Sequence, residues 1–60
     1  MQNAYKERLY YVALTVKDSD RIVRKRLSPD YFDAGNARRA CEQLRQKHPQ
    51  ACVVEQVRFL

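Results

Sequence analysis

An alternation of apolar and mixed side chains, with a period of two residues, runs from Leu9 to Lys17 and limits the fold more than any other feature. β-Branched and aromatic residues, which are enriched in strands, dominate the segment. This period predicts a strand with one face buried. The buried face would hold Tyr10, Val12, Leu14 and Val16.

A second strand is predicted directly after the first. The Asp-Ser-Asp sequence that follows Lys17 is typical of a tight turn, and a strand is expected over 21–27. A register with Val23 opposite Val16 keeps both valines on the buried face, and Arg24 and Arg26 then lie on the other face. A slip of one residue would bury the two arginines, so their desolvation cost favours this register.

A helix and a third strand complete the chain. Asp33 is a suitable N-cap for a helix over 34–47, and His48 before Pro49 disfavours helical geometry and ends it. A strand is expected over 51–59. The apolar stripe of the helix comprises Ala37, Ala40, Cys41 and Leu44.

The resulting fold class is α+β, in the order β-β-α-β. The first strand is the most apolar and is expected at the centre of a three-stranded antiparallel sheet of order 2-1-3, with the helix on one face. The basic second strand suits an edge. Residues 1–7 are expected to be flexible, and 8–60 to form a single domain. The predicted core comprises Val12, Leu14, Val16, Val23, Leu27, Phe32, Ala37, Cys41, Leu44, Val53, Val57 and Phe59.

Composition narrows the class of protein. The chain has 60 residues, with 12 Lys and Arg against 7 Asp and Glu, a net charge of +5. The longest segment without a charge, Leu9 to Val16, is too short to cross a bilayer, and the first seven residues lack the apolar segment of a signal peptide. These features predict a small basic protein in the cytoplasm.

The sequence offers little for catalysis or metal binding. No Ser or Cys has a general base beside it, and a single glycine excludes a glycine-rich phosphate loop. Cys41, His48 and Cys52 are the nearest approach to a metal site, but the helix would separate Cys41 from His48 by roughly 10 Å. We therefore predict no enzyme activity, no catalytic residue, no metal and no cofactor.

The basic residues point to a binding surface. Aromatic and basic groups on the sheet face without the helix could stack on bases and hold phosphates. The same uncovered face could contact a protein, or it could be a solvated face whose charges prevent edge pairing. The residues predicted to bind are Tyr11, Lys17, Arg24, Arg26, Arg38 and Arg58.

Two partner classes fit this surface: a protein with an acidic surface, which we favour, and DNA or RNA as the alternative. The open sheet face or an edge strand also offers a surface for a homodimer. No membrane contact is expected.

The β-β-α-β order is similar to small basic accessory proteins of phages and mobile elements, including inhibitors of host defence. It also resembles the arm-type DNA-binding modules of phage integrases, which have three strands before the helix. Neither resemblance rests on a motif, so no functional residue is carried over. The predicted function is stoichiometric protein–protein interaction, such as inhibition of a host nucleic-acid or defence machine.

Overall fold

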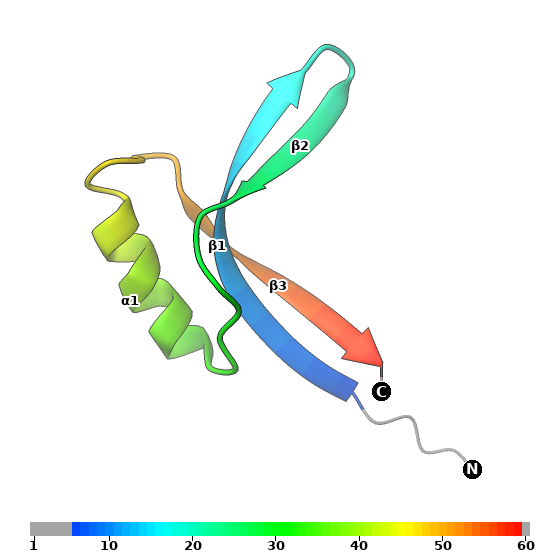
Figure 1. Cartoon of the computed structure of the whole chain (residues 1–60), viewed down its shortest axis with the longest axis vertical. Coiled ribbons are helices and arrows are strands. Elements are labelled where there is room, and N and C mark those ends of the chain that lie inside the picture. The colour runs from blue at the N-terminus through cyan, green and yellow to red at the C-terminus, as the bar shows by residue number, and fades with distance from the viewer. Residues whose placement is uncertain (1–5, 60) are drawn as a thin grey trace.

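A computed structural model describes residues 6–59 of the chain. The elements follow in the order β1 (Lys6–Asp18), β2 (Arg21–Arg26), α1 (Ala34–Leu44) and β3 (Cys52–Phe59). The strands form one antiparallel sheet of order β2-β1-β3, with α1 to one side of it (Figure 1). The predicted α+β class, strand order and helix position are confirmed.

The two outer strands pair with different halves of β1. β2 pairs with residues 13–18 and β3 with residues 6–13, so Ala13 is the one residue of β1 that has a strand partner on both sides. The far part of the β1–β2 hairpin, residues 14–25, therefore projects from the rest of the molecule (Figure 1). We call it the hairpin arm. The radius of gyration is 13.6 Å, against roughly 10 Å for a compact chain of this length.

The register of the hairpin is the predicted one. Val16 lies opposite Val23, and Asp18 lies opposite Arg21. Beyond the end of β2, the Leu27 amide donates to the Val12 carbonyl over 2.8 Å. This register places Arg24 and Arg26 on the face away from the helix, as the desolvation argument predicts.

The helix begins as predicted and ends early. Asp33 is extended, and its carboxylate accepts a hydrogen bond of 3.2 Å from the Asn36 amide. α1 ends at Leu44, and turns occupy the predicted last three residues, 45–47. The chain tightens there, because the Gln46 and Lys47 amides donate to carbonyls three residues back rather than four. Pro49 then restricts His48 to extended geometry.

The core is small. Val12 is the largest side chain that is completely buried, and it packs with Cys41 and Ala51. Leu9, Ala13 and Ala51 are buried although none of them belongs to the predicted core. The partly buried residues around this cluster are Leu14, Leu27, Ala40, Leu44 and Val53.

Five members of the predicted core are exposed, and the prediction is wrong for them. Val16 and Val23 lie in the hairpin arm, Val57 and Phe59 lie near the end of β3, and Phe32 is 76 % exposed before the helix. The side-chain alternation is correct, but the helix is too short to cover it. Eleven helical residues span about 16 Å, whereas the thirteen residues of β1 span about 43 Å.

The predicted flexible segment also needs correction. Lys6 and Glu7 belong to β1 and pair with Phe59 and Arg58. Their polar character gave no strand signal, because the partners that hold them are fifty residues away in the chain. Residues 1–5 of the predicted flexible segment lie outside the described residues.

Ser28 is the one polar residue among the described residues that is buried, and we expect it to stabilise the fold. Its Oγ accepts a hydrogen bond of 2.8 Å from the Val12 amide, at the point where β2 has ended. Ser28→Ala would leave that amide buried without an acceptor and should cost about 1–3 kcal/mol. Urea unfolding measures this loss. A change below about 0.5 kcal/mol would show that water replaces the hydroxyl.

Candidate functional site

Five of the six predicted binding residues share one face of the sheet. Val12 packs against the helix, so its neighbours Tyr11 and Ala13 lie on the opposite face, and antiparallel partners share a face. We call this the helix-free face. The predicted residues on it are Tyr11, Lys17, Arg24, Arg26 and Arg58. Arg38 belongs to α1 on the other side of the sheet, so the structure does not bring it together with them.

The Tyr11 ring and the Arg26 guanidinium are in contact with one another. The Arg26 guanidinium lies 4.1 Å from the centre of the Tyr11 ring. Its Nη1 also donates to Asp30 Oδ1 over 2.8 Å and lies 3.4 Å from the Ser28 carbonyl oxygen. A base that stacked on Tyr11 would first have to displace this guanidinium. The arrangement also explains the burial of Ala13, which lies opposite Arg26 and beside Tyr11.

Arg58 is similarly engaged. Its Nε donates to Glu7 Oε1 over 3.1 Å, and the two residues are direct cross-strand partners. Exposed ion pairs contribute little stability, so a strong ligand could separate them. Each pair nevertheless places a carboxylate beside an arginine that was predicted to hold phosphate, which lowers the positive charge of the helix-free face.

On the helix-free face, the predicted basic residues that have no ion pair within residues 6–59 lie in the hairpin arm. Within residues 6–59, neither Lys17 nor Arg24 has an ion-pair partner. Lys17 lies opposite Ile22, which is 72 % exposed. On the other face of the arm the exposed valines Val16 and Val23 are direct partners. The arm therefore presents apolar side chains on both faces, with cations beside them.

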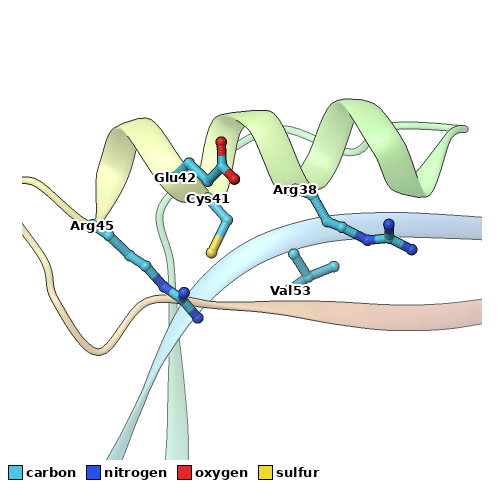
Figure 2. A pocket seen from close by; sticks show the side chains of 5 residues that line it. All are labelled: Arg38, Cys41, Glu42, Arg45 and Val53. Carbon is cyan, nitrogen blue, oxygen red and sulfur yellow. The ribbon is translucent and has the colours of Figure 1, made fainter.

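Arg38 lines a separate groove between α1 and β3. The groove has a volume of about 310 Å³. Figure 2 shows the side chains of Arg38 and Arg45 reaching from the helix toward the strands, with Cys41 and Val53 between them. Arg45 is held in place because its Nε donates to the Ala51 carbonyl over 2.9 Å. Glu42 also lines the groove, so two cations and one carboxylate face it.

Cys41 and Cys52 are free thiols, and each lies within 3.6 Å of a backbone carbonyl oxygen. No three His, Cys, Asp or Glu side chains of this part of the chain could share a metal ion. None of the helices described here is long and apolar enough to cross a membrane.

No protein-family model matches the chain, and neither the comparison with curated proteins nor that with solved structures finds a match. The function is therefore proposed from the geometry and charge of the surfaces described above.

Sequence reasoning missed the apolar part of these surfaces. Val16 and Val23 were assigned to the core and are exposed, and Ile22 was assigned no role. The lengths of the hairpin and of the helix, compared with one another, would have revealed these exposed residues. The hairpin is long and the helix that follows is short, so one helix could not cover both ends of the sheet. The ion-pair partners Glu7 and Asp30 gave no comparable signal, because their arginines meet them only through the strand pairing and the loop after β2.

Proposed function

We propose that this protein is a non-enzymatic binding module that acts by stoichiometric protein–protein interaction, with the hairpin arm as its main contact. The observation that carries the proposal is the exposed pair of Val16 and Val23, with Ile22 on the opposite face and free cations around them. Protein interfaces combine an apolar centre with a polar rim. The arm has this composition on a part of the chain that contributes little to the core.

The charge of the arm suggests the chemistry of the partner. Lys17, Arg24 and Lys25 have no ion-pair partner within the described part of the chain. An acidic protein surface would supply carboxylates to them and accelerate association by electrostatic steering. Binding of this kind would allow a small accessory protein to inhibit a larger nucleic-acid or defence machine by covering an acidic patch on it.

Direct DNA or RNA binding remains the second candidate, because Arg24 and Lys17 share a face with an aromatic ring. It is weakened by the engagement of Tyr11 with Arg26 and of Arg58 with Glu7. The two candidates differ in their salt dependence. Six phosphate contacts would lose roughly 10³-fold in affinity between 50 and 200 mM salt, whereas an interface with buried apolar anchors would keep most of its affinity.

The test uses the arm variant Val16→Asp, which adds a charge at the centre of the apolar pair. We expect the wild-type protein to capture one cellular protein at a 1:1 ratio in 200 mM salt, and Val16→Asp to lose it by tenfold or more, since a buried unpaired carboxylate is costly. Asn36→Asp adds the same charge at an exposed position in the first turn of α1 and should bind normally. In parallel, labelled DNA and RNA are titrated with the wild-type protein at roughly 50 and 200 mM salt.

Two results would contradict the proposal. One is nucleic-acid binding of micromolar affinity that falls steeply with salt and disappears in Arg24→Ala, because it would assign the arm to nucleic acid. The other is capture of the same protein by wild type and Val16→Asp alike, because it would remove the apolar pair from the interface.

A further inference from the structure

The outer edge of β3 carries free backbone hydrogen-bonding groups in a pattern that the structure defines. Tyr10 exchanges both backbone hydrogen bonds with Tyr31, over 2.8 and 2.7 Å, on the side of β1 away from β3. Backbone polar groups of successive residues point to alternate sides of a strand. The neighbours Leu9 and Tyr11 must therefore direct their backbone groups toward β3.

The same alternation identifies the free groups of β3. Leu9 and Tyr11 lie opposite Gln56 and Val54, so these residues use their backbone groups toward β1. The residues between them, Val53, Glu55 and Val57, direct their amides and carbonyls outward, where no described strand pairs with them.

This edge has few of the features that commonly protect an edge strand. It is eight residues long, contains neither proline nor lysine, and has Glu55 and Arg58 as its charged residues. Natural sheets usually shorten such strands or place lysine or proline on them to prevent pairing with another chain. Val57 and Phe59 are exposed beside the free groups, and Phe59 is 66 % exposed. A long open edge with apolar side chains is a template for an added strand.

An added strand would direct half of its side chains toward the groove between α1 and β3. Val53 lies opposite Val12 on the helix side of the sheet, so strand residues that paired directly with Val53 and Glu55 would also present their side chains on that side. Arg38 and Arg45 reach down from the helix there (Figure 2). The groove would therefore contact the side chain of every second residue of the added strand.

The spacing of the two arginines defines the pattern that fits. Arg38 and Arg45 are seven positions apart, which is about 10.5 Å along the helix axis. Residues i and i+4 of a strand are about 13 Å apart, and a flexible arginine spans the difference. The residue midway between them would face Cys41 and Val53, which form the apolar part of the groove. One carboxylate would then lie beside Glu55, whose charge Arg8 offsets, with 3.9 Å between Arg8 Nε and Glu55 Oε2.

We propose that the outer edge of β3 and the groove beneath α1 bind an extended acidic peptide segment, which adds to the sheet as a fourth strand. The segment carries two carboxylates four residues apart, for Arg38 and Arg45, and an apolar residue midway between them. A second copy of β3 has the opposite pattern, a single carboxylate, Glu55, between Val53 and Val57, so the site does not match itself. The site is separate from the hairpin arm and stands or falls independently of it.

The test uses the capped peptide Thr-Glu-Thr-Val-Thr-Glu-Thr and the control Thr-Glu-Thr-Val-Glu-Thr-Thr, which has the same composition but directs its second carboxylate to the other face. We expect the first peptide to bind about tenfold more tightly or better, since each charge-assisted hydrogen bond is worth at least that factor. Amide hydrogen exchange of the complex should slow at Val53 and Glu55, the outward-facing positions that a peptide centred beside Val53 covers.

Charge variants test which residues of the groove contribute to the affinity for the peptide. Arg38→Glu should weaken the first peptide by about tenfold or more. Arg39→Glu makes the same charge change at the next, exposed residue. It should change the affinity less than about threefold, because it acts on the peptide only through long-range electrostatics that salt screens. The arm variant Val16→Asp should bind the peptide like wild type, so failure of this site and failure of the arm are distinguishable.

Three results would overturn the proposal. Equal affinity for the two peptides would show that strand register plays no part. Displacement of the peptide by a single-stranded oligonucleotide at lower concentration, with the same dependence on Arg38, would assign the groove to nucleic acid. A protein that is dimeric without peptide and becomes monomeric in Val57→Pro would assign the edge to a second copy of the chain.

Discussion

Gln56→Pro should unfold this protein or nearly so, whereas Val57→Pro, one residue later, should leave it folded. Gln56 lies opposite Leu9 and directs its amide toward β1, as the hydrogen bonds of Tyr10 require. Proline removes that donor from a paired strand, and the lost hydrogen bond alone costs about 1–3 kcal/mol. Proteins of 60 residues have a total stability of roughly 3–9 kcal/mol, so this loss is a large part of it.

The matched variant isolates the backbone effect. Val57 directs its amide outward, and proline is tolerated on the open side of an edge strand. Val57 is also half-exposed, so we expect its replacement to cost at most about 1 kcal/mol. Urea unfolding of both variants provides the measurement. Equal destabilisation by the two prolines would show that the outward groups of β3 are not free, and the proposed peptide site would lose its basis.

Much of the fold was predictable because its strongest determinants are local. The alternation around Val12 identified the faces of β1, and the cost of burying Arg24 and Arg26 identified the register of the hairpin. The cap at Asp33 and the restriction imposed by Pro49 placed the ends of the helix within a few residues. Each of these signals depends on residues close together in the chain.

The extent of the core was not predictable in the same way. Val12 and Val16 have the same side-chain phase and the same residue type, yet one is completely buried and the other is 47 % exposed. Their difference depends on where α1 lies along the sheet, and this is determined by the packing of Cys41 and Ala51 rather than by the strand itself. Periodicity identifies the apolar face of a strand, but it does not show how much of that face another element buries.

The candidate site was predictable in location and less so in chemistry. The register placed Tyr11, Arg24 and Arg26 on one face, as expected. The ion pair of Arg26 with Asp30 was not foreseen, because it depends on the path of the chain after β2. Such pairs reverse the functional reading of an arginine. An arginine without a neighbouring carboxylate in the sequence can be paired in the structure, so the proposed contacts are residues such as Arg24, which has no ion-pair partner within residues 6–59.

Val12→Ala should produce the second large effect, a loss of about 2–3 kcal/mol. The substitution removes two methyl-sized groups, worth about 0.8 kcal/mol each, and leaves a cavity beside Cys41 that this small core cannot refill. A domain of 60 residues buries little apolar surface in total, so a single cavity removes a large share of its stability. Thermal and urea unfolding should both show the loss.

Val16→Ala is the matched control, with the same chemical change on the same face of the same strand. Val16 and its partner Val23 are about half exposed in the hairpin arm, so we expect its loss to be below about 1 kcal/mol. The contrast separates the two uses of one face: Val12 stabilises the fold, and Val16 is available to a partner. A cost at Val16 equal to that at Val12 would place the arm within the folding core and contradict its proposed role as a binding surface.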